Sequence, residues 1–446
     1  MKKVLDTLKG QEWLDEWDPE EAWDSKLAWR TLTVTTFALT LCFIAWFLVS
    51  ALAPVMADLG FELSKGQLYW LTALPGLSGG ILRIVWTFLP PILGTRKLVT
   101  YTTGLLLFPF VGWALAIQSP TTPYWVLVVL ALLAGIGGGA FSGFMPSTSY
   151  FFPRAKQGTA LGIQAGVGNF GVSIVQLFTP WLVTVFVFGG FLFGLPQLIR
   201  VDGAEGHAEV WYQNAGWFWV PFVVLGVMLS CVVLRSVPVK AAKITDQFDI
   251  FRNKHTWIMT VLYVITFGTF SGFAAVFALL IRGTFGPDKF GEEGIYGLSF
   301  AFLGALVGSV ARIVAGPVAD KLGGGIVTVV SCLGITAACV VTALQFNPSS
   351  PSQFPLFLFS MLAVFFFAGV GNASTFKQMP MIFERRQAGG VIGWTSGIAA
   401  FGPFVFGMVL ATANPEVFFL VWSVFSLVGA VLAWWYYARK NAEKPS

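Results

Sequence analysis

Residues 79–94 read GGILRIVWTFLPPILG and place Arg83 inside an apolar run, and residues 307–323, VGSVARIVAGPVADKLG, do the same with Arg312. The two Arg-Ile-Val tripeptides belong to a longer match. Each arginine is followed eleven positions later by a glycine, and then by two aliphatic residues and a threonine at 98–100 or 326–328. The chain therefore contains an internal repeat of roughly half its length, which is typical of membrane transporters built from two halves.

The composition supports this interpretation. Of the 446 residues, 56% are hydrophobic and only 11% are charged, a balance that soluble domains of this length do not show. Apolar segments long enough to cross the ~30 Å hydrocarbon layer recur with short polar breaks. We expect an all-α membrane protein with twelve transmembrane helices, near 32–57, 67–93, 98–117, 124–151, 158–188, 216–235, 256–281, 294–318, 326–346, 354–383, 389–412 and 416–437.

The positive charges indicate an orientation, because Lys and Arg near the ends of spans are retained on the cytoplasmic side. The polar segments between the spans must lie alternately on the two sides of the membrane. This assignment puts about 20 of the 27 Lys and Arg on the side of both termini and about 4 on the other side. We therefore expect a multi-pass protein of the bacterial cytoplasmic (inner) membrane with both termini in the cytoplasm. This asymmetry accounts for the net charge of +5 without a nucleic-acid partner.

The basic loop at 236–255 divides the repeat and is expected to be a cytoplasmic linker. Six spans then fall in residues 31–235 and six in residues 256–437, followed by a cytoplasmic tail at 438–446. Residues 1–30 contain the sequence WLDEWDPEEAWDSK, which is too charged for a signal peptide. We interpret them as a cytoplasmic interfacial segment that lies against the lipid headgroups, with a partner-binding arm as the alternative.

No pattern in the sequence indicates an enzyme, a cofactor or a metal site. All four cysteines lie within predicted spans, and the two histidines, His207 and His255, fall in opposite loops. The sequence therefore offers no zinc cluster, Ser-His-Asp set or phosphate-binding loop. The glycine-rich stretch at 135–143 lies within the fourth span, where close helix packing explains it.

Both arginines are predicted near the middle of the membrane. Arg83 lies sixteen positions after Gln67, about 24 Å into its helix, and Arg312 lies eighteen positions after Gly294. Burying a charge there costs on the order of 2.5–3.5 kcal/mol, and no Asp or Glu lies in the interior of a predicted span to offset it. Two unpaired guanidinium groups facing each other between the halves indicate a site for a planar anion, held by bidentate hydrogen bonds. The alternative is that they bond backbone carbonyls or reach toward the headgroups.

Aromatic residues are predicted around these arginines. Tyr263 and Phe267 lie four residues apart on one face of the seventh span, and Phe141 lies in the fourth span. Each ring alone is more typical of core packing. Together with the arginines, such rings would cover a flat anion and exclude water, while the Tyr hydroxyl and a neutral amide would donate hydrogen bonds.

The fifth and eleventh spans carry glycines at spacings that bare one helix face and let backbones approach closely. We expect these glycines to serve helix packing and gating: Gly162, Gly166, Gly168, Gly171, Gly389, Gly393 and Gly397. Asn169, Ser173 and Ser396 add polar groups that packing does not require.

The loop GPVADKLGG at 316–324 resembles the Gly-x-x-x-Asp-(Arg/Lys)-x-Gly loop that marks the major facilitator superfamily. The segments AGVGNFGVS at 165–173 and IGWTSGIAAFGPF at 392–404 resemble the paired signature motifs of the nitrate/nitrite porters of that superfamily, the NarK type. The resemblance covers almost the whole chain. It implies the two-half superfamily fold and a nitrate and nitrite transporter, with a place in nitrate assimilation, that works by alternating access in the lipid bilayer.

The resemblance also implies roles for single residues. Nitrate would be clamped by the two arginines, walled by three rings and contacted by an amide: Arg83, Arg312, Phe141, Tyr263, Phe267 and Asn169. Ser396 is our further candidate for a substrate contact. We expect a monomer, because each chain supplies both halves of its own site.

Lys377 is a third basic residue inside a predicted span, seven positions before Glu384. The exchangers of the resembling family have a neutral residue there and a longer link between spans ten and eleven. A buried Lys can release a proton whereas Arg does not, and no carboxylate is predicted beside Lys377. We therefore hypothesise that Lys377 couples inward nitrate transport to protons, as a symporter. The alternative is a nitrate/nitrite antiporter, with Lys377 reaching toward the headgroups.

Other functions fit the sequence less well. A phosphate or organophosphate exchanger would also use arginines between two halves, but a divalent tetrahedral anion needs more donors than we find. A receptor or scaffold would be expected to carry a large soluble domain. An enzyme would need a nucleophile, a base or a metal set inside the spans.

Overall fold

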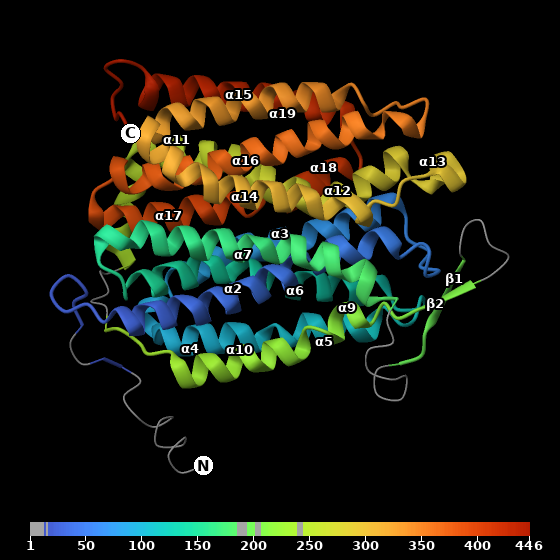
Figure 1. Ribbon diagram of the computed structural model, residues 1–446, viewed down its shortest axis with the longest axis horizontal. Helices are drawn as coiled ribbons and strands as arrows, with labels where there is room; N and C mark the ends of the chain where they lie inside the picture. The colour runs from blue at the N-terminus through green and yellow to red at the C-terminus, as the bar shows by residue number, and fades with distance from the viewer. Residues whose placement is uncertain (1–12, 15–16, 185–193, 201–206, 239–243) are drawn as a thin grey trace, which may run out of the picture.

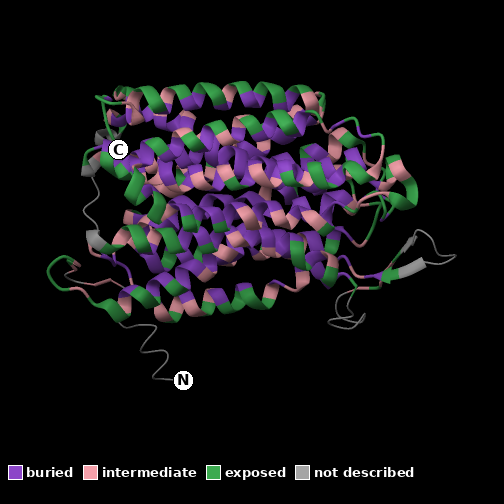
Figure 2. Ribbon diagram, turned by 45° about the horizontal axis from the view of Figure 1, so that its top comes forward, coloured by how far each residue is buried: buried purple, intermediate pink, exposed green. Residues whose placement is uncertain are grey.

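The computed structural model describes residues 13–14, 17–184, 194–200, 207–238 and 244–446, which are almost entirely helical (Figure 1). Twelve helical stretches among them are long and apolar enough to cross a membrane, which confirms the predicted number. Exposed residues lie on the outward sides of the helices (Figure 2). Many of them have large apolar side chains, as lipid contact requires. The chain is therefore a multi-pass membrane protein. Parts of the expected N-terminal segment (1–12, 15–16) and linker (239–243) lie outside the described residues.

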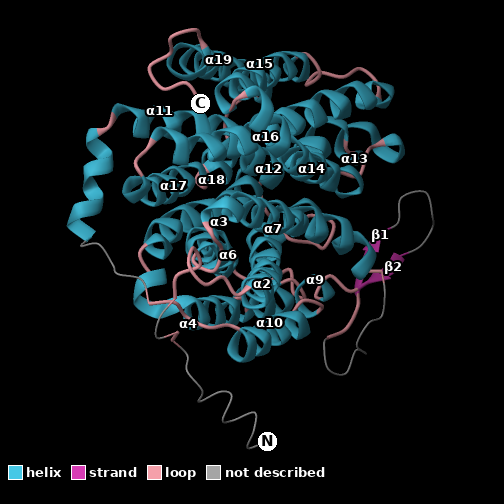
Figure 3. Cartoon of the chain, turned by 60° about the vertical axis from the view of Figure 1, so that its left-hand side comes forward, coloured by secondary structure: helices cyan, strands magenta, loops and turns pink. Residues whose placement is uncertain are grey.

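Helices of the first part of the chain gather in one bundle (Figure 3). They are α2 (Ser25–Leu52), α3 (Lys65–Thr87), α4 (Pro90–Leu105), α5 (Leu107–Ala116), α6 (Tyr124–Ser149), α7 (Arg154–Leu182), α9 (Asn214–Trp217) and α10 (Val220–Val233), with a 3₁₀ turn at Ala53–Val55. A 3₁₀ segment at Ile244–Arg252 leads to the second bundle.

The second bundle lies beside the first and contains the remaining spans (Figure 3). Its helices are α11 (Lys254–Tyr263), α12 (Thr269–Phe285), α13 (Pro287–Phe290), α14 (Leu298–Leu322), α15 (Gly324–Ala343), α16 (Phe354–Ile382), α17 (Arg385–Ala399), α18 (Gly402–Leu410) and α19 (Pro415–Ala433). π-Helical turns at Val264–Gly268 and Trp434–Ala438 continue α11 and α19, and 3₁₀ turns lie at Gly291–Glu293 and Pro351–Gln353.

The two ends of the bundles differ (Figure 1). We call the end with residues 17–24 and 439–446 the terminal face. The other end, the hairpin face, carries α13 and two antiparallel strands, β1 (Gln197–Arg200) and β2 (His207–Val210). The sequence analysis did not predict this hairpin, because four-residue strands in a charged loop give little periodicity to detect.

The internal repeat extends to the backbone conformation. Gly94 and Gly323, which follow Arg83 and Arg312 at the same distance, have φ angles of 72° and 89°. This left-handed conformation turns the chain sharply before α15 and before the main part of α4, and glycine adopts it without steric cost. The repeat therefore specifies two equivalent turns at the terminal face.

The described part of the N-terminal segment packs on the protein itself. The indole nitrogens of Trp17 and Trp23 donate hydrogen bonds of 2.8 and 3.1 Å to the carbonyls of Tyr150 and Phe151. These carbonyls lie at the C-terminal end of α6, where the helix leaves acceptors without partners. The two tryptophans thus cap α6 and cover the loop before α7.

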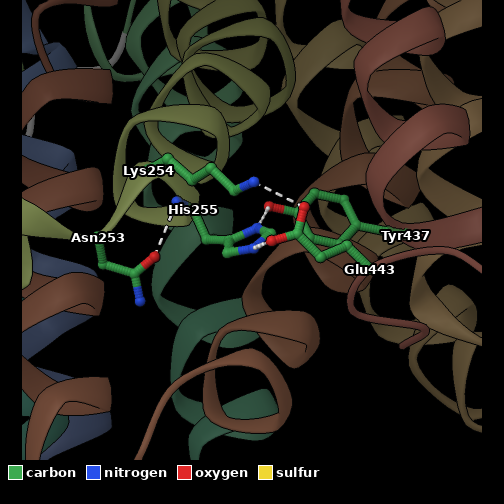
Figure 4. Close-up of polar contacts among 5 residues, drawn as sticks. All are labelled: Asn253, Lys254, His255, Tyr437 and Glu443. Carbon is green, nitrogen blue, oxygen red and sulfur yellow. Dashed lines mark hydrogen bonds and ion pairs between the residues drawn. The ribbon is translucent and has the colours of Figure 1, made fainter.

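Residues 439–446 fold back onto the start of α11 (Figure 4). The Glu443 carboxylate accepts a 2.7 Å hydrogen bond from Lys254 and lies 3.3 Å from Nε2 of His255. The other ring nitrogen of His255 lies 3.0 Å from the Tyr437 hydroxyl, and Asn253 caps the helix by accepting from the His255 amide. The Lys254 hydrogen bond holds the pKa of Glu443 below its usual value.

The two bundles are joined firmly on the hairpin side. Arg282 of α12 donates two hydrogen bonds of 2.8 Å to Asp58 of the other bundle and a further one to the Pro54 carbonyl. The Gln176 amide donates across the same interface to the Ala274 carbonyl at 2.8 Å. Because Gly76 has no side chain, α3 approaches the backbone of Phe404 closely.

The terminal side is looser. Hypothetical Cβ atoms on Gly162 of α7 and Gly316 of α14 would meet no atom of the described residues within 4 Å. Neighbouring side chains such as Ile163 and Val314 are exposed. The bundles therefore separate toward the terminal face and close against each other toward the hairpin face.

We expect the Glu443 contact to release residues 439–446 in acid. The pKa of the Glu443 carboxyl is lowered when residues 439–446 are docked. The stability that the contact gives to docking is therefore complete above the usual pKa of 4.5 and is lost as the pH falls through the lowered pKa. A spin label at Lys444 should be immobile at pH 7 and should become mobile as the pH falls through the lowered pKa of Glu443. Glu443→Gln should make it mobile at both pH values, whereas equal mobility of variant and wild type at pH 7 would contradict the assignment.

Asp58→Asn should loosen the hairpin-side closure, because it leaves Arg282 without its charged partner in the other bundle. Spin labels at the exposed residues Thr121 and Ser349, with the four native cysteines replaced by serine, would report the separation of the bundles. We expect longer distances in the variant. Asp288→Asn is the matched control, since Asp288 lies 3.5 Å from the same arginine but belongs to the same bundle. Equal distributions for all three proteins would show that the ion pair does not hold the closure.

Candidate functional site

Arg83 is fully buried where the two bundles meet. Its Nε donates a 2.8 Å hydrogen bond to the carbonyl of Gly138 on α6, and its Nη1 donates a 3.1 Å hydrogen bond to the carbonyl of Ser396 on α17. Gly138 is the fifteenth of the 26 residues of α6, so the guanidinium lies near the middle of the membrane span. The sequence analysis gave as one alternative that the arginines bond backbone carbonyls, and this part of it holds for Arg83.

Three aromatic rings surround the Arg83 guanidinium. Its central carbon lies 4.7 Å from the ring centre of Phe141, 4.9 Å from that of Phe267 and 5.1 Å from that of Trp46. Aromatic faces attract a cation, and the attraction strengthens where water is excluded. The rings thus replace part of the hydration that the charge loses, without neutralising it.

Arg312 lies on the other side of the same aromatic cluster. Its guanidinium carbon is 5.6 Å from the ring centre of Phe376, and this ring is 6.3 Å from Phe141 and 6.2 Å from Tyr263. Phe141 therefore contacts the Arg83 guanidinium on one side and the ring that covers Arg312 on the other. The structure brings both arginines, predicted from a repeat 229 residues apart, to one place between the bundles.

The local fold of the seventh span positions two of these rings. The π-helical turn at Val264–Gly268 adds one residue to a helical turn, and such turns are often found at functional sites. Tyr263 and Phe267 nevertheless stack on each other, with ring centres 5.5 Å apart and planes 7° from parallel. The two form a continuous aromatic wall beside the guanidinium groups.

Several buried polar atoms around this cluster have no hydrogen-bond partner among the described residues. They are Nη2 of Arg83, Nη1 of Arg312, the hydroxyl of Tyr263 and both amide atoms of Asn169. None of the ion pairs formed by described residues involves Arg83 or Arg312. A buried donor without a partner is costly, so this many in one place indicate a site for a ligand that accepts hydrogen bonds.

The remaining predicted contacts lie on the helices around the arginines. Asn169 follows Gly166 by three residues on α7, and a Cβ on Gly166 would collide with Ile313, the neighbour of Arg312. Ser396 contributes its backbone carbonyl to Arg83, and its hydroxyl lies 3.3 Å from that of Ser142. Asn169 is thus one turn from the α7–α14 contact, while Ser396 orients a guanidinium directly.

The glycines of the two signature segments face different partners. Gly168 and Gly171 pack on α2 within the first bundle, whereas Gly166 packs on α14, and Gly393 and Gly397 pack on α3, across the two bundles. Gly162 and Gly389, nearer the terminal face, would meet no described atom with an added Cβ. Among the glycines of these two segments, those that approach the other bundle closely therefore lie near the arginines.

Sequence reasoning missed Trp46 and Phe376, whose rings cover the two guanidinium groups. The sequence contains 44 Phe and 18 Trp, so a single aromatic residue in a span carries no signal. It also passed over Asn372, which is fully buried and has no partner for either amide atom among the described residues. A signal was available, because the segment AGVGN at 165–169 recurs at 368–372.

The interpretation of Lys377 requires a correction. Its ammonium group forms an ion pair with Asp320, so it is not isolated from carboxylates. The eighth span was predicted to end near residue 318, before Asp320, but α14 continues to Leu322 and carries Asp320 inside the helix. The side chains of both residues are partly exposed, at 28% and 66%, so the pair lies toward the terminal face.

Comparisons with known proteins agree with this architecture. The family model of the Major Facilitator Superfamily matches residues 35–396. A protein of Thermus thermophilus named "Probable nitrate/nitrite antiporter NarK2" is 58% identical over 449 residues, covering 99% of this chain and 100% of the relative. The "Nitrate/nitrite transporter NarU" of Escherichia coli K12 is 34% identical over 459 residues, covering 96% of each.

Solved structures show the same fold at low sequence identity. The crystal structure of a D-xylose-proton symporter superposes with a TM-score of 0.67 at 13% identity, covering 91% of this chain and 97% of that one. A bacterial homologue of the human lysosomal transporter Spinster, in an inward-facing and occupied conformation, superposes with a TM-score of 0.61 at 15% identity, covering 90% and 95%.

Twelve spans in two bundles, with a charged site where the bundles meet, define a transporter of the major facilitator superfamily, and the chain belongs to that superfamily. Within it, the chain belongs to the nitrate/nitrite porter family, as its full-length relatives show. It is a transport protein and not an enzyme, as the sequence analysis predicted.

Tyr263→Phe should leave the empty protein at least as stable as the wild type, because it removes a buried hydroxyl that costs about 1–3 kcal/mol when unpaired. The same change should reduce the stabilisation by a bound anion. The midpoint of thermal unfolding in detergent, with and without the anion, measures both effects. Tyr437→Phe is the matched control, since it removes a bonded hydroxyl and should cost about 1 kcal/mol. Strong destabilisation by Tyr263→Phe would mean that its hydroxyl serves the fold.

Proposed function

We propose that this protein carries nitrate and nitrite across a membrane by alternating access. The observation that supports the proposal is the pair of buried guanidinium groups, Arg83 and Arg312, each with an unpaired donor inside one aromatic enclosure. The names of the full-length relatives, which refer to nitrate and nitrite, point to the same substrates.

The chemistry of the site suits a small planar oxyanion. A guanidinium offers parallel N–H donors in one plane, which match two oxygens of a planar anion. The flat walls of Phe141 and Phe267, with ring centres 6.5 Å apart and planes 29° from parallel, leave little room for a tetrahedral anion. A bound monovalent anion would offset charge that the carbonyls and rings leave uncompensated.

Alternating access would follow from the two bundles. We propose that residues 31–235 rock against residues 256–437 about the anion, with residues 236–255 as the linker. The described state is closed on the hairpin side by Arg282 and Asp58 and looser on the terminal side. If the terminal face lies on the cytoplasmic side of the inner membrane, the described state would be the inward-facing one. Each chain supplies both arginines, so a monomer would be sufficient.

The hypothesis of proton coupling rested on an isolated Lys377. The sequence favours inward nitrate/proton symport, but the ion pair with Asp320 removes the reason for choosing Lys377 as a proton carrier. The arginine site itself favours nitrate/nitrite antiport. Two uncompensated positive charges make the empty site costly to close, whereas an anion bound in each direction neutralises it in both half-cycles.

Arg83→Lys and Arg312→Lys should each lower kcat/KM for nitrate at least tenfold. An ammonium cannot form the bidentate contact, and a lost charge-assisted hydrogen bond costs about 1.5–3 kcal/mol, or about 10–100-fold. Uptake of labelled nitrate into proteoliposomes measures the effect. Arg30→Lys, on the exposed start of α2, is the control and should transport normally. Wild-type rates in both site variants would refute the clamp.

The same proteoliposomes separate the two coupling modes. An antiporter should take up nitrate only when nitrate or nitrite is inside, and Lys377→Gln should retain this exchange. A symporter should accumulate nitrate in empty vesicles under an inward proton gradient, and Lys377→Gln should abolish that accumulation. Asp320→Asn is the control that breaks the ion pair and leaves the lysine in place.

A further inference from the structure

Asn372 of α16 combines complete burial with the absence of any partner. Neither its amide nitrogen nor its oxygen bonds any of the described residues, as is also true of Asn169. Both asparagines end the same five-residue segment, AGVGN, on α7 in one bundle and on α16 in the other. The chain thus places the same polar group in the same glycine-rich context on two helices that both pack against α14.

The helix packing locates Asn372 opposite the turn that carries Arg312. A Cβ on Gly369 would collide with the carbonyl oxygen of Gly308, and the Phe376 ring covers the Arg312 guanidinium. Gly369, Asn372 and Phe376 lie at i, i+3 and i+7 and therefore share one face of α16. Asn372 lies between these two contacts, so its amide faces the stretch of α14 between Gly308 and Arg312.

That stretch contains a second polar group without a partner. The Ser309 hydroxyl is fully buried and bonds none of the described residues, and it precedes Arg312, whose Nη1 is also unpaired, by one helical turn. An amide on α16 and a hydroxyl and a guanidinium donor on one turn of α14 therefore lie at the same level of two packed helices, each without a partner among the described residues. The other polar groups nearby on α16 are satisfied: Ser374 bonds Thr328 at 2.7 Å, and Thr375 bonds the Gly371 carbonyl at 2.6 Å.

We propose that Asn372, supported by Ser309, is an anion-binding residue that extends the site of the two arginines along α14. The inference rests on the proposed function and adds a specificity-determining contact to it. The amide nitrogen donates to an anion oxygen without adding charge, which suits a monovalent anion better than a divalent one. A role in the fold does not explain the residue, because an amide buried without partners destabilises the empty protein.

The test compares two substitutions at Asn372 with a neighbouring control. Asn372→Leu removes the amide and keeps a similar volume, and Asn372→Asp keeps the shape but replaces the donor by a negative charge. Ser374→Ala is the control, since Ser374 lies two residues away and its hydroxyl is bonded. Thermal unfolding and nitrate titration of the purified full-length chain in detergent, with chloride as the reference salt, give stability and affinity separately.

We expect Asn372→Leu to keep or raise the unfolding midpoint of the empty protein and to weaken nitrate binding roughly tenfold, as the loss of one hydrogen bond to a charged group predicts. Asn372→Asp should weaken it further and provides the test if the leucine variant fails to fold. Ser374→Ala should lower the midpoint and leave the affinity unchanged.

Two results would overturn the inference in different ways. Wild-type nitrate affinity in folded Asn372→Leu and Asn372→Asp would exclude a contact between Asn372 and the anion, while the arginine site would stand. If neither the wild type nor Ser374→Ala bound nitrate, the proposed function would fail and the role of Asn372 with it.

Discussion

A fully buried guanidinium with no carboxylate partner is the constraint on which the rest of the structure depends. Arg83 is compensated by two backbone carbonyls and three aromatic rings, which solvate the charge without cancelling it. One of those carbonyls belongs to Ser396 in the other bundle. The charge therefore ties the two bundles together at the depth where a substrate would bind, and the occupancy of the site and the contact between the bundles become linked.

This linkage suggests why the closure on the hairpin side is built as it is. The Arg282–Asp58 pair is partly exposed, and exposed ion pairs contribute little net stability, so the pair can break and form again. Close backbone approaches at glycines such as Gly76 complete the seal. A closure made of such contacts can open when the free-energy difference between the closed and open states changes by a few kcal/mol.

The polar groups of the core fall into two classes. Most are bonded within their own bundle, as Ser374 is to Thr328, and these stabilise the fold. Others have no partner among the described residues, and several of these lie around the arginines or on the helices that carry them, as the Tyr263 hydroxyl and the amides of Asn169 and Asn372 do. Lys377 belongs to the first class because Asp320 pairs with it, so its location inside a span does not by itself make it a transport residue.

The sequence alone determined the number of spans, the two-fold repeat and the unusual placement of Arg83 and Arg312 inside spans, because hydropathy and a charge in an apolar run are local signals that the bilayer makes costly to violate. It also predicted the rings of Tyr263, Phe267 and Phe141 near them. Only the tertiary structure decided which partners each group has. The pairing of Lys377 with Asp320, the rings of Trp46 and Phe376, and the unsatisfied amide of Asn372 depend on how helices distant in the chain pack, and no spacing within one helix encodes that contact.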